Sequence, residues 1–251
     1  MSRNWDAATY DRVSSPLVKL ATAVLDRLDL QGDETVLDAG CGSGRVTRLL
    51  LERLPQGNVI AVDGALSMVE HTRAALDGRA TVLQGDLNEL VLEEPVDAVF
   101  SSAVFHWIAD HDRLFERLFA VLRPGGRLVA QCGGEGNIES FHEAARVVGA
   151  MAPYAEYLAG WAGPWHFAGP AETAARLERA GFSEVKTWLE PHPISPEDPE
   201  DYLRTICLGY HLEQLPEDLH DDYVREVLER SGGELDYVRL NIVASRPRAS
   251  P

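Results

Sequence analysis

Cysteine, lysine and long apolar runs are all scarce in this chain of 251 residues. The three cysteines, Cys41, Cys132 and Cys207, are far apart and odd in number, so they suggest neither a disulfide framework nor a metal-ligand spacing. No apolar run approaches the ~18 residues that a membrane span requires, and the first residues lack the apolar stretch of a secretory signal. We therefore expect a cytoplasmic protein without a bound metal and without a membrane partner.

Positive charge is also in short supply. Two lysines, Lys19 and Lys186, accompany 21 arginines, and the formal net charge is −17. A nucleic-acid surface requires a basic patch, so this charge argues against a nucleic-acid partner. The acidity is concentrated in residues 196–236, which hold 13 Asp and Glu against three Arg. The preference for arginine, together with frequent alanine, is typical of a GC-rich bacterial genome.

The length and the hydrophobic content of 45% suit one large α/β domain. Short apolar strands alternate with helical patterns as far as about residue 134, which is typical of βαβ units and of a parallel sheet covered on both faces. The predicted strands cover 35–40, 58–64, 80–86, 96–103 and 127–134. The predicted helices cover 17–29, 44–54, 67–76 and 110–122.

After Gly134 this alternation breaks. Residues 137–168 have a helical pattern that Gly and Pro interrupt, and residues 196–232 hold a proline-rich acidic loop and two more helical stretches. We expect both segments to form a helical cap over the carboxyl ends of the strands, within a single domain over 1–251, because ligands bind there in open α/β sheets. The remaining predicted elements are a helix over 171–180 and strands over 183–190 and 236–245.

The stretch VLDAGCGSGRVTRLL, residues 36–50, predicts a strand that turns through glycine into a helix. Gly40, Gly42 and Gly44 let the backbone approach a ligand, and the free N–H groups at the helix start favour an anion. The spacing G-x-G-x-G differs from the dinucleotide fingerprint G-x-G-x-x-G, since Arg45 stands where its third glycine would be. A tight turn without any ligand is the alternative.

Three carboxylates at the ends of predicted strands indicate what this turn binds. Asp38 precedes the glycines, where it would repel a pyrophosphate and attract an ammonium group. Asp63 ends the second strand, and a carboxylate there can accept both hydroxyls of a ribose. Asp86 ends the third strand and can accept from an exocyclic amine. An amino-acid end, a ribose and an adenine describe S-adenosylmethionine (SAM) rather than NAD.

Five segments, taken together and in order, resemble the class I SAM-dependent methyltransferases. They are VLDAGCGSG, VIAVDGALSMVEHTR, LQGDLNEL, FSSAVFHWIADHDRLFERLFAVLRPGGRLVAQ and RLERAGFSEV. The N-terminal WDAATYD and the final YVRLNIVAS loosely resemble the trans-aconitate and malonyl-carrier methyltransferase group. The resemblance implies an α/β, Rossmann-like sheet of seven strands with its last strand antiparallel beside the fifth, an enzyme that transfers methyl groups, and SAM as the cofactor.

The resemblance also implies a set of cofactor-binding residues. They are Tyr10, Asp38, Gly40, Gly42, Gly44, Asp63, Gly64, Met68, Asp86, Leu87, Ser101 and Ser102. The glycine turn would hold the methionine part of SAM, Asp63 the ribose, and Asp86 the adenine amine. For Met68 the alternative is core packing, and for Tyr10 it is a surface position on a helix.

His106 is the predicted catalytic residue, because it follows the fourth strand where the resemblance places the methyl group. It would act as a general base toward a hydroxyl or amine, and the alternative is a packing or structural role. An excess of aromatic residues over 141–167 predicts either contacts with the acceptor or packing of the cap. The candidate acceptor-binding residues are Tyr154, Trp161, Trp165 and His166.

The expected function is methylation of a small-molecule acceptor on O, N or C, for example in secondary metabolism. Because the cap is acidic, we expect a neutral or cationic acceptor, since a tricarboxylate such as trans-aconitate would need clustered cations. The arginines considered for that purpose are Arg12, Arg146, Arg176 and Arg204. The alternatives are a carboxyl methyltransferase of trans-aconitate or of a carrier-bound acyl group, a SAM-binding protein without turnover, and a nicotinamide oxidoreductase. The sequence leaves the oligomeric state open.

Overall fold

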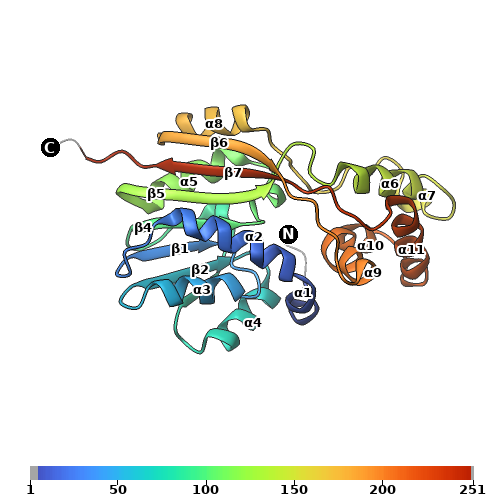
Figure 1. The fold of residues 1–251 in the computed structure, drawn as a ribbon, viewed down its shortest axis with the longest axis horizontal. Coiled ribbons are helices and arrows are strands. Elements are labelled where there is room, and N and C mark those ends of the chain that lie inside the picture. The colour runs from blue at the N-terminus through green and yellow to red at the C-terminus, as the bar shows by residue number, and fades with distance from the viewer. Residues whose placement is uncertain (1–4, 250–251) are drawn as a thin grey trace.

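The computed structural model describes residues 5–249. A seven-stranded sheet in the order β3-β2-β1-β4-β5-β7-β6 runs through it (Figure 1). The strands are β1 (Thr35–Ala39), β2 (Asn58–Asp63), β3 (Thr81–Gln84), β4 (Val96–Ser102), β5 (Leu122–Gly133), β6 (Ser183–Pro191) and β7 (Val238–Ser245). Strands β1 to β5 are parallel, and β7 lies antiparallel between β5 and β6. The predicted Rossmann-like sheet with an antiparallel last strand is therefore confirmed.

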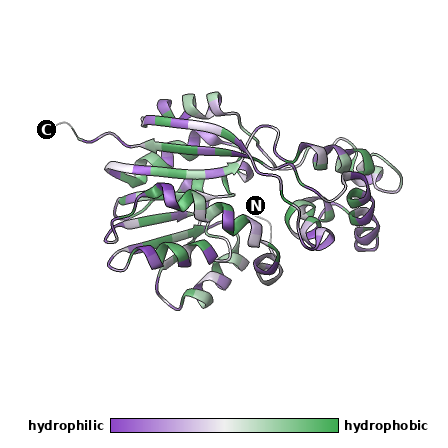
Figure 2. Ribbon diagram, in the orientation of Figure 1, coloured by the Kyte–Doolittle hydropathy of each residue, from purple (hydrophilic) through white to green (hydrophobic). Residues whose placement is uncertain are grey.

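Helices cover both faces of the sheet, because parallel strands are apolar on both sides. One face carries α2 (Ser15–Leu25), α3 (Arg45–Arg53) and α4 (Leu66–Leu76), and the other carries α5 (His111–Val121) and α8 (Pro170–Arg179). Figure 2 shows hydrophobic residues along the central strands and mixed residues along the helices, as expected of amphipathic covering helices.

A helical lobe lies beyond the carboxyl ends of the parallel strands (Figure 1). It consists of α6 (Glu139–Gly149), α7 (Ala155–Leu158), α9 (Pro199–Tyr202), a π-helical turn η4 (Leu203–Cys207), α10 (Gly209–Leu212) and α11 (His220–Ser231). The lobe has its own buried core, which includes Phe141, Tyr154 and Tyr223. Leu17 of α2 joins this core, so the lobe is packed onto the N-terminal helices as well.

Short elements complete the fold. They are α1 (Ala7–Val13) and the 3-10 turns η1 (Asp26–Leu28), η2 (Leu87–Glu89), η3 (Phe105–Trp107) and η5 (Glu217–Leu219). No helix within residues 5–249 is long and apolar enough to cross a membrane.

Strand β5 begins earlier than the sequence predicts, at Leu122 instead of residue 127. Leu122 pairs with Val96, and the register then shifts before Ala98 pairs with Arg127. This irregularity accommodates the Pro-Gly-Gly segment, which sequence patterns indicate as a turn. The strand therefore contains residues that do not look like strand formers.

Candidate functional site

A cavity of about 670 Å³ lies where the carboxyl ends of β1, β2 and β4 face the helical lobe. Ligands bind at this edge in open α/β sheets. Many residues predicted from the sequence lie on its wall. They are Tyr10, Gly40, Gly42, Asp63, Gly64, Met68, Asp86, Leu87, Ser102 and His106.

The glycine turn between β1 and α3 forms one side of this cavity. Gly40 has φ +89°, and a Cβ there would lie 2.1 Å from Cγ2 of Val104, so the position requires glycine. Gly42 is different, because a Cβ there would meet no protein atom within 4 Å. The free space beside Gly42 lets a ligand approach the backbone. Gly44, with φ +80°, begins α3 as its N-cap residue.

Asp63 ends β2 and lies on the cavity wall. One carboxylate oxygen accepts from the Gly42 N–H at 2.9 Å, and the other accepts from the Ala65 N–H at 2.8 Å. Burial is the main cause that raises the pKa of this carboxyl. The two backbone anchors fix its orientation and leave lone pairs on both oxygens, which suits two neighbouring hydroxyls such as those of a ribose.

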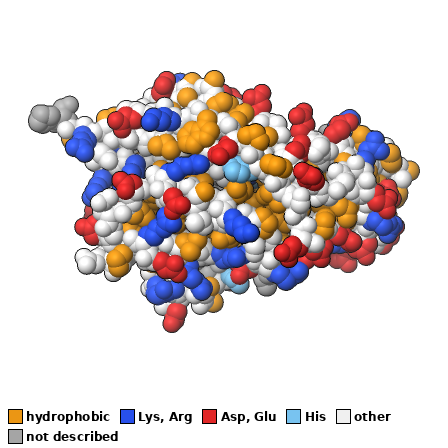
Figure 3. Space-filling view, viewed as in Figure 1, with side chains coloured by type: hydrophobic (Ala, Val, Ile, Leu, Met, Phe, Trp, Pro, Cys, Tyr) orange, Lys and Arg blue, Asp and Glu red, His pale blue; other side chains and the backbone are white. Residues whose placement is uncertain are grey.

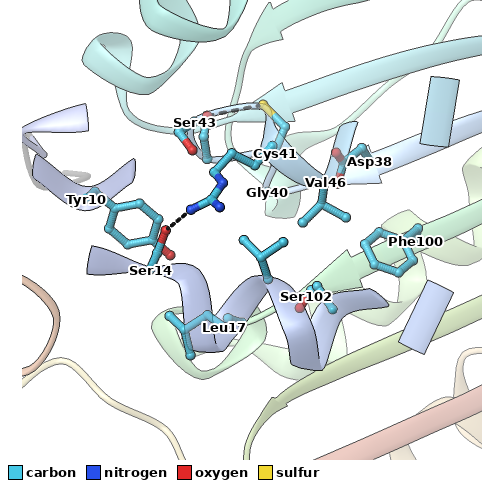
Figure 4. Close-up of a pocket in the computed structure, with 15 residues that line it drawn as sticks. Tyr10, Ser14, Leu17, Asp38, Gly40, Cys41, Ser43, Val46, Phe100 and Ser102 are labelled. Carbon is cyan, nitrogen blue, oxygen red and sulfur yellow. Dashed lines mark hydrogen bonds between the residues drawn. The ribbon is translucent and has the colours of Figure 1, made fainter. Parts of the chain in front are cut away.

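Asp38 lies beside a smaller cavity of about 60 Å³, whose wall shares Tyr10, Gly40 and Ser102 with the larger one (Figure 4). Its buried carboxylate accepts a hydrogen bond from Oγ1 of Thr47 at 2.6 Å. Burial raises the pKa of Asp38 to about 7, although the Thr47 bond opposes this shift. A positively charged ligand group would favour the ionised form and offset the burial.

This raised pKa predicts that SAM binding depends on pH. With a pKa of about 7, Asp38 is mostly protonated at pH 6, and it must release its proton to pair with the SAM ammonium group. Affinity should therefore fall as the pH drops below 7, approaching about tenfold per pH unit. Titration calorimetry in buffers of different ionisation enthalpy should show close to one proton released at pH 6. Proton-independent binding at pH 6 would contradict this pairing.

The opposite end of the cavity combines an apolar surface with an exposed carboxylate. Met68 is buried and packs with Ala65, and Trp5 and Tyr10 pack against this pair. Asp86 is the N-cap residue of η2, where its Oδ1 accepts from the Asn88 N–H at 2.9 Å. The arrangement provides a flat apolar contact and a hydrogen-bond acceptor, the features that an adenine with its exocyclic amine requires.

The two predicted serines face different ways. Ser101 is buried and donates from Oγ to the carbonyl of Ala39 at 2.7 Å, so it joins β4 to β1 and lies on neither cavity wall. Ser102 lies on both walls. Tyr10 also lies on both walls, and Figure 4 shows it projecting from α1. Burial raises the pKa of Tyr10 to about 12, so its phenol stays protonated at neutral pH.

His106 lies in η3, just after β4, and is buried at the cavity wall. Its Nδ1 accepts a hydrogen bond from the Gly133 N–H at 3.2 Å. The ring stacks on Phe167 at 5.9 Å and contacts Trp107 at 4.8 Å between centroids. Burial, and next the charge of Arg239, hold the pKa of His106 well below its usual value.

The four residues predicted to bind the acceptor lie behind the cavity wall instead of on it. Tyr154 is buried in the core of the lobe. Trp161 packs edge-on against Trp165 at 5.7 Å, and Trp165 lies 6.1 Å from Trp107, which does line the cavity. His166 is joined to the site through its backbone, whose N–H donates to the carbonyl of His106. These residues support the wall in the structure, and their contact with an acceptor stays a prediction.

Sequence reasoning missed several residues of the wall. They are Trp5, Trp107, Ile206, Tyr210, Tyr237 and Arg239. Arg239 is the most informative, because its side chain is 2% exposed and its Cζ lies 5.5 Å from the Tyr237 ring. A signal was present in the sequence, since Arg239 interrupts an apolar run in a strand that is buried on both faces.

The arginines considered from the sequence are engaged elsewhere. Each pairs with an acidic residue, Arg12 with Asp201, Arg146 with Glu143, Arg176 with Glu172 and Arg204 with Asp221, at 2.5 to 2.7 Å. None of the four lies on the wall of the larger cavity. Figure 3 shows acidic side chains gathered along the edge of the lobe, over α9 and α11. The acidity is therefore on the outer surface, whereas Arg239 is inside.

The fold and the glycine turn define a Rossmann-like α/β protein, and comparisons with known proteins identify the family. A family profile described as "Methyltransferase domain" matches residues 36–126. The trans-aconitate 2-methyltransferase of Azoarcus sp. (strain BH72) is 32% identical over 227 residues, which cover 88% of this chain and 86% of that protein. The trans-aconitate 2-methyltransferase of Methylobacterium nodulans is 34% identical over 187 residues, or 74% and 67% of the two chains.

A solved structure shares the fold. Phosphoethanolamine N-methyltransferase 2 of Haemonchus contortus, in complex with S-adenosyl-L-methionine, superposes with a TM-score of 0.62 at 19% identity, covering 96% of this chain and 57% of that one. The chain belongs to the class I SAM-dependent methyltransferases, and SAM is its cofactor. The free space beside Gly42 and the anchored carboxylate of Asp63 fit this cofactor.

Proposed function

We propose that the protein methylates a small-molecule acceptor that carries a carboxylate, and that Arg239 binds this carboxylate. The observation that carries the proposal is the buried guanidinium of Arg239 on the wall of the larger cavity. A charge in that position requires a partner, and among residues 5–249 the guanidinium contacts the Tyr237 ring and forms no ion pair.

The energetic argument begins with burial. Removing an unpaired ion from water costs several kcal/mol, even after the protein relaxes. Nε of Arg239 has no hydrogen-bond partner, and no Asp or Glu within residues 5–249 forms an ion pair with it. Burial lowers the pKa of Arg239, but an arginine side chain remains charged at any physiological pH. An anionic ligand would offset the cost, and the planar guanidinium matches a carboxylate through two parallel hydrogen bonds.

The relatives support the same class of acceptor. Two proteins that this chain resembles along most of its length are named for trans-aconitate, which is a tricarboxylic acid. The sequence led to the expectation of a neutral or cationic acceptor because residues 196–236 are acidic. That acidity lies on the outer surface of the lobe (Figure 3), so it does not set the charge of the cavity.

The residues on the wall explain how a carboxylate would react. When bound, SAM supplies a methyl carbon attached to a positively charged sulfur. Arg239 would hold the acceptor in one orientation, which is the main requirement when the leaving group is already good. A carboxylate is anionic at neutral pH, so no general base is needed to remove a proton. Trp107 and Tyr210 form an aromatic wall that keeps water from the reacting groups.

A product screen tests the proposal. The protein is incubated with SAM that carries a CD3 group and with a matched panel of carboxylic acids, their amides, amines and phenols, including trans-aconitate. Mass spectrometry should show labelled methyl esters from members of the acid set and none from the matched amides. Labelled amines or phenols without any labelled ester would contradict the proposal that the acceptor carries a carboxylate. No product at all, with SAM binding intact, would favour a SAM-binding protein without turnover.

A further inference from the structure

His106 has its ring orientation fixed by the sheet beside it. Nδ1 accepts from the backbone N–H of Gly133, the last residue of β5, at 3.2 Å. A backbone N–H cannot give up its proton at physiological pH, so Nδ1 must present its lone pair. A neutral imidazole carries one proton, which is then on Nε2.

The surroundings keep this ring neutral. The charged and titratable groups that act on it are Arg239 on β7, His111 on α5 and His142 on α6, and the Cys132 thiol on β5 lies against its backbone. The cation disfavours a second positive charge, and neither neutral histidine stabilises one. Burial adds to this effect, so His106 stays uncharged through the physiological range.

We propose that His106 is a fixed hydrogen-bond donor that presents Nε2–H to the acceptor's carboxylate, instead of a general base. The ring lines the cavity, and among the described residues Nε2 has no hydrogen-bond partner. A nitrogen that already carries a proton cannot accept another, and the lone pair of Nδ1 is engaged by Gly133. The ring can therefore donate a hydrogen bond to an oxygen of the ligand, but it cannot accept one from the N–H or O–H of a protonated nucleophile.

Arg239 lies on the same side of the site. It is the register partner of Gly133 in the pairing of β7 with β5, and Gly133 is the residue that fixes the His106 ring. Arg239 and His106 both lie on the wall of the larger cavity, the charge of Arg239 acts on the His106 ring, and the guanidinium and the Nε2–H are both donors only. Two donors in this arrangement select a group with several lone pairs, such as a carboxylate, and they repel an ammonium group. This inference rests on the proposed function for the identity of the ligand.

The tautomer of His106 can be determined by NMR, without an activity assay. Protein labelled with ¹⁵N-histidine is examined by long-range ¹H–¹⁵N correlation, and the His106 signals are assigned by their loss in His106→Leu. An unprotonated Nδ1 and a protonated Nε2 across about pH 6 to 8 are expected. A protonated Nδ1, or a ring that titrates in this interval, would overturn the proposal. This measurement needs no acceptor, so its result is independent of the proposed function.

Kinetics with the acceptor from the product screen give the second readout. His106→Leu should raise the acceptor KM about tenfold, the effect of one lost hydrogen bond to a charged group. His106→Gln, whose amide N–H reaches a similar point, should raise it only about threefold. When SAM is kept saturating at every pH, so that the Asp38 titration does not affect the rate, the acceptor kcat/KM of the unaltered protein should not follow a histidine titration between about pH 6 and 8. A rate that rises through this interval, and that no longer depends on pH in His106→Gln, would instead support His106 as a general base.

Discussion

Replacing Arg239 with methionine should lower the acceptor kcat/KM by about 30-fold or more, since truncating one partner of a buried charge pair costs about 2–5 kcal/mol. Methionine keeps the apolar stem that packs beside Tyr237 while it removes the charge. The loss should appear in the acceptor parameters, with the SAM dissociation constant within about twofold. Steady-state kinetics with the identified acid, and calorimetry with SAM, measure the two effects.

The matched control is Arg204→Met, because Arg204 was one of the cations considered from the sequence. Its guanidinium pairs with Asp221 on the surface of the lobe, and its loss should change kcat/KM by less than about twofold.

Arg239→Met should also unfold at a higher temperature than the unaltered protein when no ligand is present, since it removes a buried unpaired charge. If Arg239→Met weakened SAM binding and left the acceptor KM unchanged, the guanidinium would bind the cofactor's own carboxylate.

Replacing Asp63 with alanine should weaken SAM binding by about 2 kcal/mol, or about 30-fold, with little change in the acceptor KM. The variant loses the acceptor for the ribose hydroxyls, and it also frees the N–H groups of Gly42 and Ala65 that anchor the turn. Titration calorimetry with SAM provides the measurement.

Glu70→Ala is the control for Asp63→Ala. Glu70 is an exposed carboxylate on α4, near in sequence but absent from both cavity walls. Its removal should leave the SAM affinity within about twofold, as most surface substitutions do. An Asp63→Ala protein that binds SAM with unchanged affinity would show that Asp63 does not bind the ribose, even if the fold and activity were retained.

The cofactor side of the site was predictable because it is local. Asp38 and Asp63 lie at the ends of β1 and β2, Gly42 lies in the turn that follows β1, and the carboxyl ends of parallel strands meet at one edge of the sheet. A short sequence pattern therefore specifies both the residue and its place. The resemblance added the antiparallel β7, which no local pattern gives.

The acceptor side depends on contacts between distant segments. The aromatic excess over 141–167 belongs largely to the lobe, where Tyr154 is part of the core and Trp161 packs against it, and their contact with an acceptor stays a prediction. Arg239 enters the site only because β7 is inserted between β5 and β6, more than 100 residues after Gly133. The role of His106 likewise depends on a backbone N–H of another strand, which periodicity cannot indicate.

The acidic surface of the helical lobe affects how quickly a charged acceptor arrives. Acidic side chains cover α9 and α11 on the surface of the lobe (Figure 3), and the lobe forms part of the cavity wall, so their negative potential should repel an anion that approaches. Added salt shortens the range of that repulsion, from about 10 Å at 0.1 M to about 3 Å at 1 M. The acceptor kcat/KM should therefore rise with ionic strength, which is the reverse of electrostatic steering. A fall in kcat/KM over a sodium chloride series would indicate attraction at the entrance, and the enzyme would then favour dilute conditions over saline ones.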